Sequence, residues 1–178
     1  MYTLIIGMPL YLGDVRNAST ATIGFVLLCQ SVAMVVISPV MGSLADRVGP
    51  GPMLLGGAGL LLANQLALVA IFDDPPLLLL GISLLVFGIG LGTLSPAMQS
   101  AALKAWPAEI SGAASGTMNM SRYVGSVTGM AIAAAILGAN PDEATFRLLF
   151  LVISAFAVVT LGAAIAMSRV AGNAPAEA

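Results

Sequence analysis

The stretch LLLLGISLLVFGIGLGTLSPAMQSAAL runs from Leu77 to Leu103 without a single charged residue. An α-helix rises about 1.5 Å per residue, so a helix of this length crosses the roughly 30 Å hydrocarbon core of a bilayer. The apolar residues are continuous rather than alternating, which argues against a strand of a membrane barrel. The stretch therefore predicts a transmembrane α-helix.

Outward from this helix, uncharged intervals alternate with short loops along the whole chain. The charges gather in those loops, as membrane insertion requires, because a charge at mid-membrane costs about 3 kcal/mol. We expect one all-α integral membrane domain over residues 1–178, a six-helix transmembrane bundle whose first helix is truncated. The expected spans are 1–12 (partial), 22–44, 53–72, 77–103, 110–138 and 148–167, with a cytoplasmic tail at 168–178.

The first segment, MYTLIIGMPLYL, is apolar but too short to cross a bilayer. It has no basic region and no small-residue cleavage site, so it is not expected to be a signal peptide. We interpret it as the end of a membrane helix whose beginning is missing. The chain is thus expected to have been cut from a longer protein, or to start inside one.

The composition excludes several classes of protein. Only 8% of the 178 residues are charged and 59% are hydrophobic, whereas about 25% of a soluble domain is charged. The net charge of −2 and the scattered basic residues provide no patch for nucleic acid. With no His and with Cys29 as the one Cys, no metal site or cofactor is expected. An enzyme is disfavoured, because no acids, nucleophiles or metal ligands converge within the spans.

Basic residues in the loops set the expected orientation. Alternate loops place Arg47, Lys104 and Arg169 on one side and Arg16 and Arg147 on the other. The side with more basic residues is expected to be cytoplasmic.

The loop after the second span reads GSLADRVG over residues 42–49. It resembles the G-x-x-x-D-R/K-x-G motif that the major facilitator superfamily carries in a cytoplasmic loop between two helices. Gly42 permits close helix approach and Gly49 a tight turn, and we expect Asp46 and Arg47 to pair at the helix end. These four residues are the expected conformational motif. The basic residues that usually follow it are replaced here by Pro-Gly-Pro.

The run from Gly88 to Gly138 is similar to the carboxy-terminal half of the drug/proton antiporter subgroup of that family. The similarity lies in SGAASG at 111–116 and in Asn119, Arg122, Gly125 and Gly129. It implies the carboxy-terminal half of a multi-pass cell-membrane transporter, exporting drugs or other small organic solutes by alternating access. The implied partners are the lipid bilayer, the solute, a missing amino-terminal half and protons as coupling ion. No Asp or Glu lies inside a span, so a coupling acid would belong to the missing half.

Arg122 is the one charge that falls inside an expected span. At about 100° per residue it shares one helix stripe with Asn119 and Ser126. Exposing these polar side chains to lipid would cost free energy. We expect the stripe to face other helices or a water-filled cavity. The structural alternative, in which Arg122 snorkels or clamps helix-end carbonyls, stays open. The substrate-cavity candidates are Arg122, Asn119, Gln30 and Ser126.

Small residues and prolines inside the spans indicate helix packing and gating. Glycines at helical spacing let backbones approach, and a proline removes a helix hydrogen bond, giving either a fixed bend or a gate. The candidates are Pro39, Gly88, Gly92, Pro96, Gly112, Gly116, Gly125 and Gly129. The alternative to a transporter half is a truncated inactive fragment, or an accessory helical bundle without transport activity.

Overall fold

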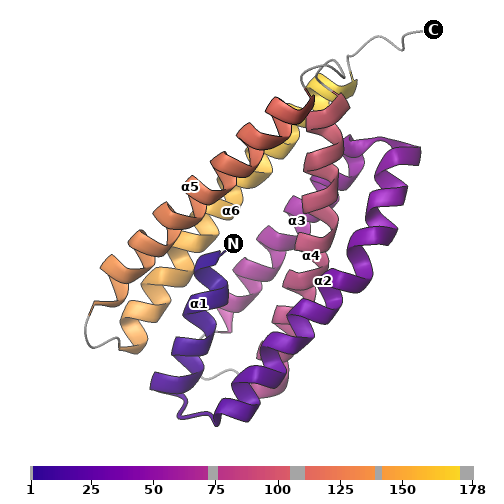
Figure 1. Cartoon of the computed structure of the whole chain (residues 1–178). Coiled ribbons are helices and arrows are strands. Elements are labelled where there is room, and N and C mark those ends of the chain that lie inside the picture. The colour runs from indigo at the N-terminus through magenta and orange to yellow at the C-terminus, as the bar shows by residue number, and fades with distance from the viewer. Residues whose placement is uncertain (1, 72–75, 105–110, 139–141, 173–178) are drawn as a thin grey trace, which may run out of the picture.

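A computed structural model describes residues 2–71, 76–104, 111–138 and 142–172, all arranged in a bundle of helices (Figure 1). The helices are α1 (Tyr2–Leu10) with a π-helical turn (Tyr11–Val15), α2 (Thr20–Val48), α3 (Pro50–Ala70), α4 (Leu77–Lys104), α5 (Ser111–Leu137) and α6 (Glu143–Gly172). The described ranges contain no strand. Helices α2 to α6 are each long and apolar enough to cross a membrane. The prediction of an all-α membrane bundle is therefore confirmed.

The turn between α2 and α3 depends on one glycine. Gly49 has a backbone φ of 95°, which residues with a Cβ atom rarely adopt. Its N–H donates to the Ala45 carbonyl at 3.0 Å, closing the end of α2. Pro50 then occupies the first turn of α3, where its missing N–H is not needed. Gly49 is thus the one residue between the end of α2 at Val48 and the start of α3 at Pro50.

Helix α6 begins at Glu143, ahead of the span expected from Leu148. The Asp142 carboxylate accepts hydrogen bonds from the Thr145 main-chain N–H, at 2.8 Å, and from the Thr145 hydroxyl. These bonds lower the pKa of Asp142 and cap the helix start. The expected cytoplasmic tail at 168–178 begins within α6, and its residues 173–178 lie outside the described ranges.

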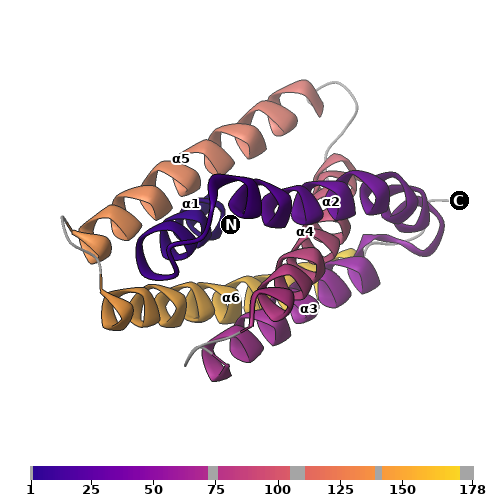
Figure 2. The same cartoon turned by 90° about the horizontal axis from the view of Figure 1, so that it is seen from below.

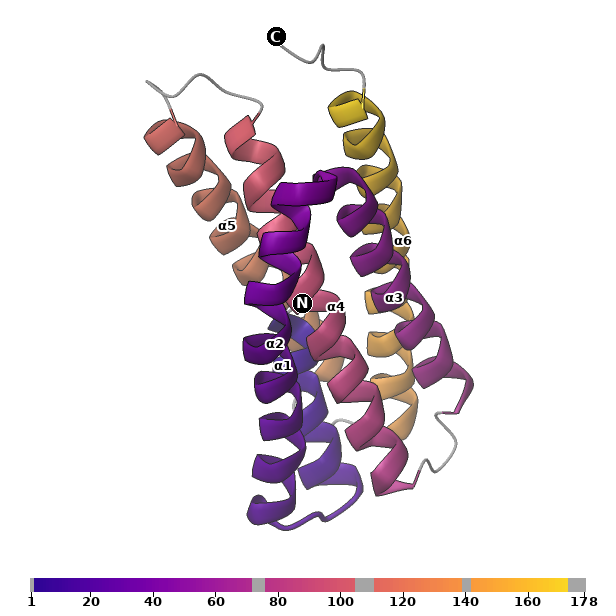
Figure 3. The same cartoon turned by 90° about the vertical axis from the view of Figure 1, so that its right-hand side faces the viewer.

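Helix α4 packs between α2 on one side and α3 on the other (Figure 3). A Cβ on Gly88 would lie 2.4 Å from the main-chain oxygen of Gln30, and one on Gly92 would lie 3.1 Å from that of Met34. On the α3 side, a Cβ on Gly57 would lie 3.0 Å from the Leu94 main-chain nitrogen. Glycine therefore allows the backbone of α4 to approach both neighbours closely.

The two prolines sit inside continuous helices. Pro39 lies within α2 and Pro96 within α4. A Cβ on Gly42 would lie 3.7 Å from the Pro96 Cβ, an ordinary contact that places the conformational motif beside the proline of α4. Whether either proline acts as a gate stays a prediction.

Helix α5 lies along one edge of the bundle, as the view from below shows (Figure 2). Only its Ser126, Ala133 and Leu137 are described as buried. Three glycines of α5 were expected to pack against another helix. A Cβ added to any of them would have no atom within 4 Å; they are Gly112, Gly116 and Gly125. In the described ranges these three glycines show no close helix contact, so a packing role for them stays a prediction.

Candidate functional site

A cavity of about 630 Å³ opens between α3, α4, α5 and α6. This volume falls in the range of pockets that hold drug-sized molecules. Its lining is largely apolar, with Leu61 from α3, Phe87 and Leu91 from α4, and Val152 and Phe156 from α6.

Arg122 is the one charged side chain among the described residues that line the cavity. It reaches the cavity from α5, and its Nη2 donates to the Asn119 Oδ1 at 3.1 Å, one helical turn away. A neutral amide orients the guanidinium without cancelling its charge. In the described ranges no carboxylate pairs with Arg122, so the side chain retains N–H donors for an acceptor on a bound molecule.

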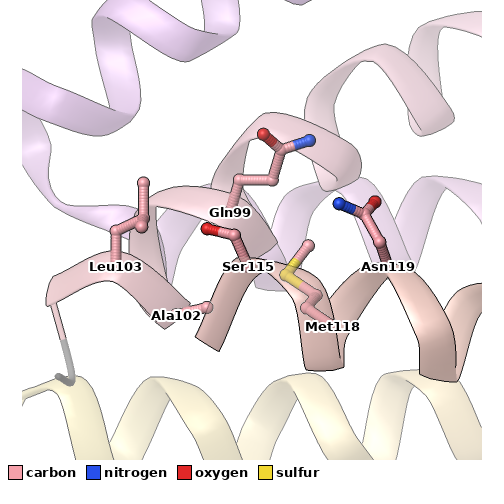
Figure 4. A pocket seen from close by; sticks show the side chains of 6 residues that line it. All are labelled: Gln99, Ala102, Leu103, Ser115, Met118 and Asn119. Atoms are coloured by element: carbon pink, nitrogen blue, oxygen red, sulfur yellow. The ribbon is translucent and has the colours of Figure 1, made fainter. Parts of the chain in front are cut away.

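The other α5 candidates lie close to Arg122. Ser126 lines the same cavity and donates to the Tyr123 carbonyl at 2.7 Å. Asn119 lines a second cavity of about 40 Å³ together with Gln99 and Ser115 (Figure 4). Met118 lines both cavities. The predicted stripe of α5 thus brings a cation, an amide and a hydroxyl to one side of the bundle.

Gln30 is not brought to this site. It lies in α2, buried, with its main-chain oxygen against Gly88 of α4, and it is absent from the described lining of both cavities. The physical reason is that α2 packs on a different face of α4 from the one that lines the cavity. Gln30 therefore belongs to the α2–α4 contact.

Gln65 is one of several polar cavity residues that were not among the candidates from the sequence, with Ser95, Ser121, Thr128 and Thr160. It lies on α3, is only 1% exposed, and lines the cavity with Leu61, one helical turn away. The adjacent Asn64 is used within the fold, since its Oδ1 accepts from the Ser83 hydroxyl at 3.1 Å. The one signal in the sequence was the pair of neighbouring amides in an otherwise apolar span.

The conformational motif makes a different contact from the one expected. The Ser100 hydroxyl of α4 donates to the Asp46 Oδ1 at 3.3 Å. No ion pair joins Asp46 to Arg47 in the described ranges, because consecutive helical residues point about 100° apart. Arg47 is exposed at the end of α2. Asp46 therefore connects α2 to α4, and a role in conformational switching stays a prediction.

The described part of the chain contains no cluster of side chains that could hold a metal ion. No group of three or more His, Cys, Asp or Glu side chains gathers there. The chemistry that the cavity offers is thus apolar contact, hydrogen bonding and one positive charge.

Comparison with known proteins identifies what the chain resembles. A family model described as Major Facilitator Superfamily matches residues 1–177. The uncharacterized MFS-type transporter YwoD of Bacillus subtilis is 29% identical over 167 residues, covering 94% of this chain and 36% of the relative. The multidrug resistance protein Stp of Mycobacterium tuberculosis is 31% identical over 140 residues, or 78% of this chain and 26% of the relative.

A third relative is the riboflavin transporter RibZ of Clostridioides difficile, which is 31% identical over 105 residues, or 59% of this chain and 23% of the relative. The chain thus spans about a third or less of the length of these curated relatives. No solved structure matches it significantly.

Proposed function

Because the chain belongs to the major facilitator superfamily, we propose that it forms one six-helix unit of a secondary transporter that exports small organic solutes, drugs among them, by alternating access. It is a multi-pass protein of the cell membrane, as the sequence predicted. Two relatives support export of drug-like solutes, since their names describe a multidrug resistance protein and a methylenomycin A resistance protein. The observation that carries the proposal is the largely apolar cavity with Arg122 at its α5 wall.

The proposal includes a second six-helix unit, which the exposure of α5 supports. Arg122 is exposed, and lies eleven residues from Ser111 at the start of α5, roughly 16 Å along a helix. That depth is near the middle of a bilayer, where an uncovered charge costs about 3 kcal/mol. Protein or water must therefore cover this face. The greater length of the relatives is consistent with a covering unit encoded in the same polypeptide.

The charge of the cavity favours neutral or anionic solutes. Arg122 attracts a carboxylate or a carbonyl oxygen and repels a cation, and in a largely apolar cavity this effect is stronger than in water. Among the described lining residues there is no Asp or Glu to offset it. We therefore place the acid that would couple transport to protons in the second unit.

An efflux assay tests the proposal. The full-length carrier that contains this chain is expressed in bacteria that lack their own drug exporters. The cells are then loaded with a panel of neutral, anionic and cationic fluorescent solutes. We expect several-fold faster efflux than in vector-only cells for members of the neutral and anionic groups, and no acceleration for the cations. Unaccelerated efflux across the whole panel would contradict the proposal and favour an inactive or accessory bundle.

A further inference from the structure

Gln65 presents an unusual combination of burial and missing partners. Its side chain is 1% exposed, and neither the amide nitrogen nor the amide oxygen has a hydrogen-bond partner among the described residues. Buried amides in folded proteins almost always have partners, because an unmade hydrogen bond in an apolar environment is costly. The Gln30 Oε1 and the Asn64 Nδ2 also have no partner, but among the described residues Gln65 alone is unpartnered at both ends of its amide and lines the cavity. The Gln65 amide can therefore take a partner from outside the chain.

The position of Gln65 indicates where that partner binds. Leu61 and Gln65 are separated by four residues, so they lie on one face of α3, and both line the large cavity. Helices α3 and α5 lie on opposite sides of the bundle (Figure 2). A molecule in the cavity therefore has Gln65 on one wall and Arg122 on the other.

We propose that Gln65 is the hydrogen-bonding anchor for the solute, and that the cavity takes apolar molecules carrying a lactam, an imide or a primary carboxamide. A glutamine amide offers one acceptor oxygen and two N–H donors. These three classes of group present an N–H beside a C=O, so each can satisfy both ends of the Gln65 amide at once. The apolar remainder of the molecule fits the surrounding aliphatic and aromatic lining, such as Leu61, Phe87 and Leu91.

The inference deepens the proposed function, because it names a class of solute, and its consequence for transport rests on that function. The anchor itself is a property of binding alone. A site that hydrogen-bonds a ligand discriminates strongly against an analogue that lacks the donor, since the buried partner is then left unsatisfied. Selectivity between two such analogues is thus the appropriate measurement.

The test uses 7-amino-quinolin-2-one, a fluorescent lactam, and its N-methyl derivative, which lacks the lactam N–H. Both are titrated against the purified chain in detergent. We expect the wild type to bind the lactam about tenfold more tightly than the N-methyl derivative. Gln65→Met, similar in length but apolar, should bring this ratio close to one. Gln30→Met is the matched control, because it removes a buried amide outside the cavity and should leave the tenfold ratio intact.

A second variant keeps the test decisive if Gln65→Met does not fold. Gln65→Asn keeps the amide but withdraws it by one methylene, and should give a ratio between those of the wild type and Gln65→Met. A wild type that does not distinguish the two compounds, or an unchanged ratio in both Gln65 variants, overturns the anchor. Selective binding together with a carrier that expels nothing would contradict the proposed function and leave the anchor in place.

Discussion

Replacing Arg122 with alanine is expected to lower solute transport by roughly a hundredfold, the loss that removing one or two hydrogen bonds to a charged group produces. The guanidinium is the one charge among the described residues of the cavity, and its bond to Asn119 fixes its direction. Alanine leaves the Ser126 hydroxyl at the α5 wall of the cavity but no cation. Initial efflux rates, divided by the amount of carrier in the membrane, measure the effect.

Two variants control this experiment. Arg122→Lys keeps the positive charge but not the forked geometry, and should retain part of the rate. Arg169→Ala removes an arginine in the last turn of α6, away from the cavity, and should transport at the wild-type rate. All three carriers should insert in equal amounts. Wild-type transport by Arg122→Ala would show that the residue is neither a binding group nor part of the switching machinery.

The second large effect is expected from Gly88→Ala. The added methyl group would lie 2.4 Å from the Gln30 main-chain oxygen, far inside contact distance, so α2 and α4 must separate. Overpacking of this kind costs about 1 to 3 kcal/mol, which corresponds to a fall in Tm of roughly 3 to 10 °C for a chain of this size. Thermal unfolding of the purified chain in detergent measures the shift.

Gly81→Ala is the matched control for this prediction. Gly81 lies on the same helix, and an added Cβ meets nothing within 4 Å. Its Tm should stay at or slightly above the wild-type value, because alanine is the better helix former. If the two variants have the same Tm, the contact between α2 and α4 is not as close as described.

The membrane helices could be predicted from the sequence because the bilayer imposes a simple requirement. Leu77–Leu103 has no charge and is long enough to span, and nearly the same residues form α4. Helix ends were harder to predict, since they depend on local hydrogen bonds. The Asp142 carboxylate, capping through Thr145, starts α6 ahead of the apolar run. Such a bond does not change the hydropathy of the sequence.

The α5 part of the candidate site was also predictable. Asn119, Arg122 and Ser126 fall on one stripe of α5, so helical spacing groups them. The same spacing puts Ser121 and Thr128 elsewhere around the helix, yet both line the cavity. The remaining amides carried no such signal. Helices α2 and α3 are apolar around most of their circumference, so periodicity does not indicate which amide faces a cavity. Gln30 was selected and Gln65 was not, and only tertiary packing separates them.

The central claim is that the solute occupies the cavity between α3, α4, α5 and α6 on its way through the protein. Site-directed labelling in a Cys29→Ser background tests it with two single-cysteine variants. Ser121→Cys places the thiol at a residue that lines the cavity, and Met120→Cys places it at a neighbour that is 70% exposed and outside the described lining.

Both variants react with a methanethiosulfonate reagent in the presence and absence of the quinolin-2-one. The solute should slow the reaction several-fold in Ser121→Cys and leave the rate unchanged in Met120→Cys, because only the first thiol lies where the solute binds. Equal rates with and without the solute in both variants, or equal slowing in both, would contradict the account.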